Sequence, residues 1–371
     1  MKDYMAILNL AENENDIRAL TTNRPIASVP IGSRYRVIDF MLSNLVNAGI
    51  GNVGIFTESN SRSLADHLGT GKPWDLNRKN DGLFLFNHGL CNLMYTDSKL
   101  IKNNMEYIYR SKSKDVILCS SYMVCNMDFT DVIRSHEDSD ADITVVYTHT
   151  KNADKEFSNC FTLDIDPATK ELRGAGKNIG IGPEADVCME IFLMTKERLT
   201  DFIYKSTSLT SLTNFYNLIF DQIGSLKFNT YRFEGYVSCI NTVSSYFKSN
   251  MDMLEPDVST ELFRSNIRPI FTKIKDEPPT IYIKGCRVGH SLIADGCRIE
   301  GTVTDSLLGR YVDVEEGAVV KNSIILQNVR IHKNARLSHV IIDKNVDIDE
   351  NTELKGNEFF PLVIEKRNLL R

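Results

Sequence analysis

The chain has 371 residues, of which 42% are hydrophobic and 25% charged, and its formal net charge is −6. This length and composition can bury two cores, so we expect two domains. The acidic balance excludes a general electrostatic attraction to nucleic acid or to anionic membranes. No apolar run is long enough to span a bilayer, and the N-terminus lacks the apolar core of a signal peptide. We therefore expect a cytoplasmic protein with neither nucleic acid nor membrane as a partner.

Eight cysteines are scattered along the chain without a C-x-x-C pair. Paired cysteines at short spacing are typical of zinc sites. An even number of cysteines in a short secreted chain is typical of a disulfide framework. Neither pattern is present, so we expect reduced, mostly buried thiols.

The first 254 residues alternate short apolar strands with helical stretches, which is typical of a doubly wound, Rossmann-like α/β sheet. Strands are expected at Met5–Leu10, Val53–Phe56, Asp115–Ser120 and Ala141–Tyr147. Helices are expected at Val37–Ala48, Ser61–Leu68, Leu100–Arg110 and Asp131–Glu137. Phe161–Ile165 and Glu171–Arg173 can form a hairpin, and a helix-rich stretch follows between residues 195 and 224.

The end of this first domain is predicted from a proline. Val243–Met253 has the pattern of a closing helix, which Glu255-Pro256 would end. Residues 255–280 then form a polar connector.

From residue 281 to residue 371 the pattern changes to a repeat of 17 residues with internal steps of six. Six-residue steps grouped in threes predict a left-handed parallel β-helix, with one aliphatic residue of each face directed inward. The repeat is carried by four columns, which are Leu308/Ile325/Ile342, Val312/Val329/Val346, Val314/Ile331/Ile348 and Val303/Val320/Leu337/Leu354.

The loop after the first strand, residues 11–16, contains three acids and no glycine. A phosphate cradle needs backbone N–H groups that approach the anion closely, which glycine permits. Glu12, Glu14 and Asp16 would instead repel a triphosphate, at a cost of about 1 kcal/mol per like-charge pair at ~4 Å in water and more in a cleft. The same acids could also belong to an ordinary surface turn.

The segment Pro30–Asn44 resembles a signature of sugar-1-phosphate nucleotidylyltransferases, in particular the ADP-glucose pyrophosphorylases. This resemblance implies that the acidic loop stands where the family has a Gly-rich, nucleotide-binding loop. It also implies that Ile26 stands where the family has a phosphate-contacting lysine. The two Mg²⁺-binding aspartates of the family match Ser121, in Leu118–Ser121, and Cys239, in Val237–Thr242.

These replacements fall on one mechanism, because nucleotidylyl transfer needs Mg²⁺ to neutralise charge and align the reacting groups. Mg²⁺ prefers anionic oxygen ligands, and a hydroxyl or a thiol is a poor substitute. We therefore expect no catalytic residues, no metal and no cofactor in this chain, although catalytic members of the family use Mg²⁺. The combination of a degenerate site with an intact signature resembles the GlgD-type regulatory subunits of the family.

That resemblance implies a role in ADP-glucose supply for glycogen biosynthesis, exerted through a catalytic subunit in a hetero-oligomer, expected to be a heterotetramer. A phosphorylated metabolite is the implied effector. Lys177 falls near a sugar-phosphate-binding segment of the family, and we expect an effector or phosphate site from Arg34, Arg36, Lys366 and Arg367.

Two other functions remain open from the sequence. An active nucleotidylyltransferase would need a displaced metal site, for which Asp97 or Asp128 would supply carboxylates. A hexapeptide acyltransferase would use a histidine of the β-helix, for which His290, His332 and His339 are available, although these histidines can also be ordinary outward-facing residues of the coils.

Overall fold

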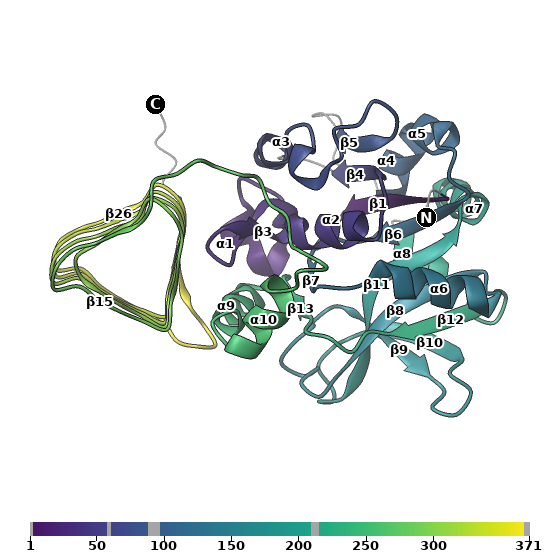
Figure 1. Cartoon of the computed structure of the whole chain (residues 1–371). Helices are drawn as coiled ribbons and strands as arrows, with labels where there is room; N and C mark the ends of the chain where they lie inside the picture. Colours follow the sequence, from purple (N-terminus) through teal and green to yellow (C-terminus); the bar gives the residue numbers. More distant parts are fainter. Residues whose placement is uncertain (1–2, 58–60, 88–96, 209–214, 367–371) are drawn as a thin grey trace. The chain divides into compact units, whose positions relative to one another are not determined.

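The computed structural model describes residues 3–57, 61–87, 97–208 and 215–366. Its contacts divide the chain into two compact units that are interleaved in sequence (Figure 1). The first unit contains residues 1–13, 38–239 and 266–271, and the second contains residues 14–37, 240–265 and 272–371. The boundaries predicted from the sequence, at residues 254 and 281, divide the chain differently, because they leave residues 14–37 and 240–254 with the α/β domain.

A nine-stranded mixed sheet forms the centre of the first unit. Its parallel part contains β1 (Tyr4–Leu10), β4 (Asn52–Thr57), β5 (Gly82–Asn87) and β6 (Asp115–Cys119). β1 is buried along its whole length, as expected for a central parallel strand that is covered on both faces. These strands confirm the α/β class predicted from their apolar runs.

The other part of the sheet is built around the long strand β11 (Ala185–Thr195), which pairs antiparallel with β6, β8 (Ile143–Thr150) and β9 (Phe161–Ile165). β12 (Phe228–Arg232) extends β8 in parallel. The predicted hairpin is present, since β9 pairs antiparallel with β10 (Leu172–Lys177). Asp166 holds its turn by accepting hydrogen bonds from the backbone N–H groups of Ala168 and Thr169.

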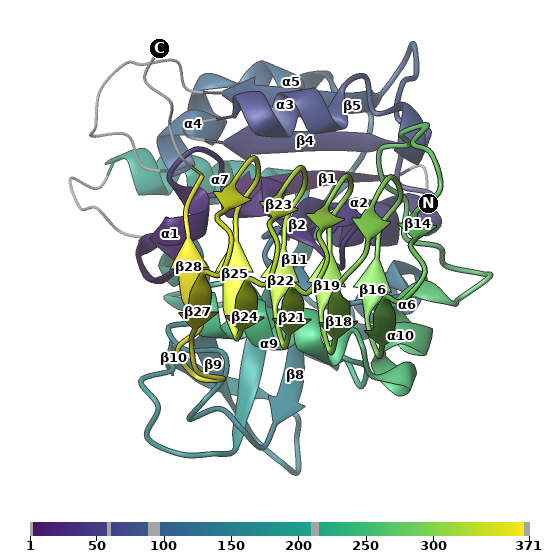
Figure 2. The same cartoon turned by 90° about the vertical axis from the view of Figure 1, so that its left-hand side faces the viewer.

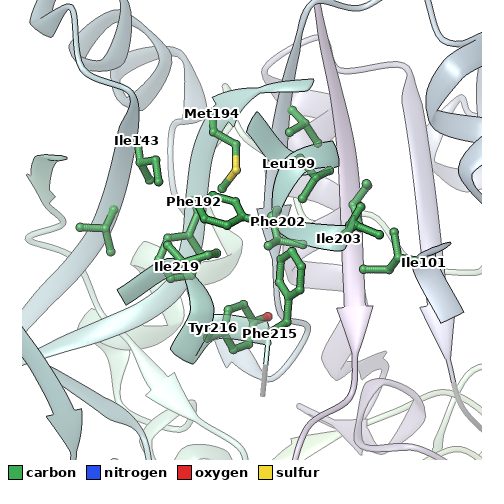
Figure 3. Packing of buried hydrophobic residues seen from close by; sticks show 14 of the residues in the cluster. Ile101, Ile143, Phe192, Met194, Leu199, Phe202, Ile203, Phe215, Tyr216 and Ile219 are labelled. Atoms are coloured by element: carbon green, nitrogen blue, oxygen red, sulfur yellow. The ribbon is translucent and has the colours of Figure 1, made fainter. Parts of the chain in front are cut away.

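Helices of the first unit bury apolar side chains against this sheet. They are α2 (Val37–Asn47), α3 (Arg62–Leu68), α4 (Asp97–Asn103), α5 (Met105–Arg110), α6 (Phe129–Ser139), α7 (Lys196–Ser208) and α8 (Phe215–Phe220). Figure 3 shows the aromatic part of the core, where Phe192 stacks on Tyr216 at 5.5 Å between ring centroids and Phe202 meets Phe215 edge-on. The single helix predicted at residues 100–110 is in fact α4 and α5, separated by Asn104, whose side chain donates to the carbonyl of Leu100.

The second unit begins with a short hairpin of β2 (Pro30–Ile31) and β3 (Tyr35–Arg36). Helix α9 (Val243–Asp252) fixes this hairpin, because Tyr246 donates to the carbonyl of Pro30 and Asn250 accepts from the N–H of Gly32. α9 matches the predicted closing helix. The predicted connector contains a helix that the sequence analysis did not predict, α10 (Pro256–Phe263), in which Pro256 takes a first-turn position where proline needs no hydrogen bond.

The remainder of the second unit is the left-handed parallel β-helix. Figure 1 looks along its coils, which outline a triangle, and Figure 2 shows the stacked coils from the side. Three parallel five-stranded sheets form the faces, in the orders β14-β17-β20-β23-β26, β15-β18-β21-β24-β27 and β16-β19-β22-β25-β28. The strands run from β14 (Ile281–Tyr282) to β28 (Leu362–Ile364).

Strand register confirms the predicted repeat. Val303 pairs with Val320, which pairs with Leu337, and Leu308 pairs with Ile325, which pairs with Ile342. These residues are at most 2% exposed, so the columns line the interior.

Each face holds five strands, rather than the about four coils that the columns indicate. The first coil escaped the pattern because Val288 pairs with Val303 at a spacing of 15 residues. The last step is longer, since Val340 pairs with Leu362. None of the helices in the described parts of the chain is long and apolar enough to cross a membrane.

Candidate functional site

Glu12 and Ser121 form the centre of a polar cluster in the first unit. β1 and β6 are neighbouring parallel strands, and the loops after their carboxyl ends carry Glu12 and Ser121. The Glu12 carboxylate accepts hydrogen bonds of 2.8 Å from both the backbone N–H and the hydroxyl of Ser121. Burial raises the pKa of Glu12 to about 7, although the bonds from Ser121 oppose this shift. Glu12 is therefore directed into the protein instead of lying on an exposed turn.

Cys239 reaches the same cluster through a separate strand pair. β13 (Ser238–Cys239) pairs antiparallel with β7 (Met123–Val124), which places Cys239 opposite Met123, two residues beyond Ser121. The sulfur of Cys239 lies 3.5 Å from that of Cys160, and both side chains are buried. Burial raises the pKa of the Cys239 thiol well above its usual value. The seven described cysteines are all free thiols, as predicted.

Glu190 is a second acid of this cluster that the sequence did not reveal. It lies in a bulge of β11 between Cys188 and Ile191, with φ at +54° and 5% of its surface exposed. A non-glycine residue in this conformation costs roughly 1–2 kcal/mol. Tyr122 forms a hydrogen bond with its side chain, and its charge adds to the raised pKa of Glu12. A lone acid within an apolar strand is the signal that could have found it.

The side chains in this cluster do not fit Mg²⁺. The hydroxyl of Ser121 is engaged with Glu12, Cys239 offers a neutral sulfur, and the raised pKa of Glu12, about 7, makes its carboxylate less available as an anion than an ordinary acid. Among the described residues, no three His, Cys, Asp or Glu side chains are grouped so that they could hold a metal ion. What the cluster can do chemically is exchange a proton near neutral pH.

The two acids that could have formed a displaced metal site differ in their placement. Asp128 is the N-cap of α6, where it accepts from the N–H of Thr130, and its carboxylate lies 3.7 Å from Arg268. These contacts give it a structural role. The side chain of Asp97, at the start of α4, lies outside the described residues, as does Thr96.

Lys177 lies at the end of β10 and is exposed. Its ammonium group is 3.6 Å from the centroid of the Phe161 ring, which is a cation–π contact. Its charge lowers the pKa of Cys188 as a minor effect against burial. This placement leaves the predicted sugar-phosphate contact open.

The start of the second unit contains Ile26, which is buried. Its backbone N–H donates to the carboxylate of Glu14 at 2.9 Å. Glu14 therefore binds a backbone donor of this segment, and Ile26 itself presents no charge.

A cluster of cations in the second unit surrounds one buried ion pair. Arg24 and Asp343 are both buried, and the guanidinium lies 2.8 Å from the carboxylate. Arg24 also donates to the carbonyl of Leu20. Asp343 belongs to the β-helix, so this pair joins it to the first residues of the same unit.

Lys344 follows Asp343 and feels several other cations. Its pKa is lowered to about 7, first by burial and then by the charges of Arg36, Arg24 and Lys275, while Asp343 opposes them. The pKa of Lys275 is also lowered, first by burial and then by Arg310. Burial is the larger cause for both lysines, and the neighbouring cations add a smaller unfavourable charge interaction, which a bound anion would relieve.

The predicted effector residues are only partly brought together. Arg36 belongs to the cation cluster and donates to the carbonyl of Ser28. Arg34 is exposed in the turn of the β2–β3 hairpin, and Lys366 is exposed after β28. Arg367 lies outside the described residues. Sequence reasoning missed Arg24, Lys275, Arg310 and Lys344, although Arg310 and Lys344 fall in one column of the 17-residue repeat.

The chain was compared with known families and proteins. Residues 16–157 match the nucleotidyl transferase family, and residues 282–358 match the GlmU-like C-terminal hexapeptide family. The glycogen biosynthesis protein GlgD of Bacillus subtilis (strain 168) is 32% identical over 365 residues, which cover 98% of this chain and 95% of that protein. The chain belongs to the GlgD family.

Two further relatives support this assignment and extend it. GlgD of Geobacillus stearothermophilus is 37% identical over 82% of this chain and 79% of its own length. A glucose-1-phosphate adenylyltransferase of Fervidobacterium nodosum is 26% identical over 90% of this chain and 81% of its own length. The resemblance to the pyrophosphorylases is therefore confirmed, and the relationship supports a role in glycogen biosynthesis.

The histidines of the β-helix contact residues of neighbouring coils. His290 lies 3.0 Å from Asp305, and His332 lies 3.0 Å from Glu315. His339 meets Asn322 at 3.2 Å. Such contacts between coils are expected for outward-facing residues, and they favour the structural interpretation over acyl transfer.

Proposed function

We propose that this chain is a catalytically degenerate regulatory subunit of glucose-1-phosphate adenylyltransferase that acts by pairing with a catalytic homologue. The observation that carries the proposal is the contact between Glu12 and Ser121. In the catalytic relatives, the resemblance places a Mg²⁺-binding aspartate at position 121. Here that position holds a serine whose N–H and hydroxyl are both bound to a carboxylate from the former nucleotide loop.

The second metal position supports the same conclusion. Cys239 is packed against Cys160 and its thiol stays protonated, so it cannot replace an anionic oxygen. Loss of two metal ligands, of the phosphate lysine at position 26 and of the glycine-rich loop removes parts that act together in the transition state.

A regulatory subunit can activate a partner only by binding its active conformation more tightly, typically by 1–3 kcal/mol. We propose a heterotetramer as the assembly. We further propose that a phosphorylated metabolite binds the cation cluster of Arg24, Arg36, Lys275 and Lys344, because these side chains supply forked and point-charge donors for phosphate around lysines whose pKa values are already lowered.

The test is a steady-state assay with ATP, glucose 1-phosphate and Mg²⁺, using this chain alone, a catalytic adenylyltransferase from the same genome alone, and both after co-purification. We expect negligible turnover from this chain alone and a higher turnover or a changed effector response in the mixture. Turnover of the isolated chain comparable to that of the catalytic homologue would support the active enzyme with a displaced metal site instead.

A further inference from the structure

A pocket with a volume of about 370 Å³ lies in the first unit beside β5, the edge strand of the sheet. It is separate from the cluster of Glu12 and Ser121, since its lining consists of Asn52, Asp81, Phe84, Phe86, Asn103, Asn104, Glu106, Tyr107, Arg110 and Ser111. A volume of this order is within the range of small-molecule sites. Neither the polar cluster nor the cation cluster accounts for this pocket.

One wall of the pocket is aromatic. Phe84 and Phe86 lie two residues apart on β5, so both point to the same face, with their rings 6.4 Å apart and nearly parallel. Tyr107 of α5 leans against both rings, at 5.1 Å from each. Phe84 keeps 41% of its surface exposed, so an apolar ring face is available to a ligand.

The neighbouring strand leaves room for this wall. Gly54 of β4 pairs with Phe84, and a Cβ atom at position 54 would lie 2.5 Å from the Tyr107 ring. Only glycine therefore allows Tyr107 to cross the strand at this point. The hydroxyl of Tyr107 donates to Asn52 at 2.8 Å, and Asn52 donates to Ser111 at 3.1 Å, which fixes the floor of the pocket.

The remaining lining is polar, with more negative than positive charge. Asp81, Asn103 and Asn104 contribute a carboxylate and two amides. Glu106 is paired with Arg110 at 2.6 Å, which leaves the charge of Asp81 without compensation within the lining. Asp81 also contributes to the raised pKa of Tyr107, after burial, so the phenol stays protonated. A phosphate-bearing ligand would be repelled by these carboxylates.

We propose that this pocket binds the pyranose ring of a neutral hexose, either as a free sugar or as a residue of a glucan. A pyranose has an apolar face of C–H groups, which packs on aromatic rings, and an edge of hydroxyls that both donate and accept. The exposed ring of Phe84 fits the apolar face. The carboxylate of Asp81 and the amides of Asn103 and Asn104 fit the hydroxyls, since they offer acceptors and donors together. The base of a nucleotide can stack on the aromatic wall, but its phosphates are repelled by the carboxylate of Asp81.

Saturation-transfer difference NMR with glucose, maltotriose and glycogen tests the proposal, because ring protons that lie on Phe84 receive the strongest signal. We expect binding by the full chain and a loss of affinity of about tenfold or more in Phe84→Ala, as is typical for an aromatic side chain that a ligand covers. Phe84→Tyr keeps the ring and should retain binding. Equal affinities for glucose and maltotriose would identify a single-ring site for free sugar, whereas binding of glycogen and maltotriose without glucose would identify a glucan.

Tyr109→Ala is the matched control. Tyr109 is an exposed aromatic residue of α5, the helix that carries Tyr107, but its hydroxyl pairs with that of Tyr204 and it does not line the pocket. Its substitution should leave sugar binding unchanged. The melting temperature of each variant checks that folding is intact. Absence of binding by all three carbohydrates, or equal binding by the full chain and Phe84→Ala, would overturn the proposal.

Discussion

Each of the two units contains a cluster of like charges, but the charges are compensated in different ways. In the first unit, Glu12 and Glu190 approach each other, and Glu12 is hydrogen-bonded by Ser121. In the second unit, Lys344 is surrounded by Arg24 and Arg36, with the nearby carboxylate of Asp343 already paired to Arg24. The acids of the first unit are therefore compensated by hydrogen bonds from the protein and by a proton. The cations of the second unit would be stabilised by a bound anion.

This difference bears on what each cluster does. Under the proposed function, hydrogen bonding of these acids by their own neighbours goes with the loss of a metal site. A site whose lysines have lowered pKa values retains a driving force for binding, because a ligand anion restores the favourable charged state.

The largest effect is expected from an attempt to restore the first cluster. We expect Ser121→Asp combined with Cys239→Asp to give no measurable adenylyltransferase turnover, since Glu12 would repel both the new carboxylate and the triphosphate. Steady-state assays and Mg²⁺–ATP calorimetry measure this outcome. The matched variant carries Glu12→Gly in addition to Ser121→Asp and Cys239→Asp. Recovery of substantial turnover by the double variant alone would show that the former loop is not inhibitory.

The next largest effect concerns the buried ion pair of the second unit. Asp343→Asn should lower the free energy of unfolding by about 3–5 kcal/mol, because Arg24 then stays buried without its counter-charge. Chemical denaturation measures the change, and added inorganic sulfate should recover part of it by linkage. Asp349→Asn, which alters an exposed acid of the β-helix, is the control. A loss for Asp343→Asn no larger than that of the control would argue against a strained cation cluster.

Most of the fold could be predicted because it depends on repeating apolar positions. The columns of the β-helix combine position and residue type over several coils, so register followed directly from the 17-residue spacing. The first coil and α10 were missed for local reasons. One pairing step of that coil is two residues shorter, and Pro256 can either end a helix or begin one.

The candidate site was less predictable, because its contacts join residues far apart in sequence. Ser121 and Cys239 were found through the resemblance, but the direction of Glu12 depends on how β1 and β6 end side by side. Arg24 and Asp343 are 319 residues apart, and no local pattern connects them. Burial of charge is a property of the packed structure, so sequence alone suggested Arg34 where the structure gathers Arg24 and Lys344.

A smaller effect is expected from the proton on Glu12. Its pKa is about 7 in the folded chain and 4.5 as the reference value, so the folded state binds more protons between these pH values and stability decreases as pH rises through that window. Glu12→Gln should therefore be more stable than the parent at pH 8 by about 1–3 kcal/mol. This difference should narrow toward pH 4.5 in denaturation curves. Asp16→Asn in the same loop provides the control, and a pH-independent difference for Glu12→Gln would contradict the assignment.

The smallest effect is expected from the titration of Lys344 in the second cluster. Lys344 has a pKa of about 7 in the folded chain, so it gains its charge as pH falls through neutrality and should then bind an anion more tightly. Sulfate is the suitable probe because its charge is constant in this range. We expect its affinity to weaken by up to about tenfold between pH 6 and pH 8, the full factor for binding that requires one proton with this pKa.

Calorimetric titration should show this dependence in the parent chain and a flat, weaker profile in Lys344→Met. Lys333→Met, at an exposed lysine of the same β-helix, should retain the parent's profile. If Lys344→Met kept the pH dependence, another group would be responsible for it, and the cation cluster would have to be rebuilt without Lys344.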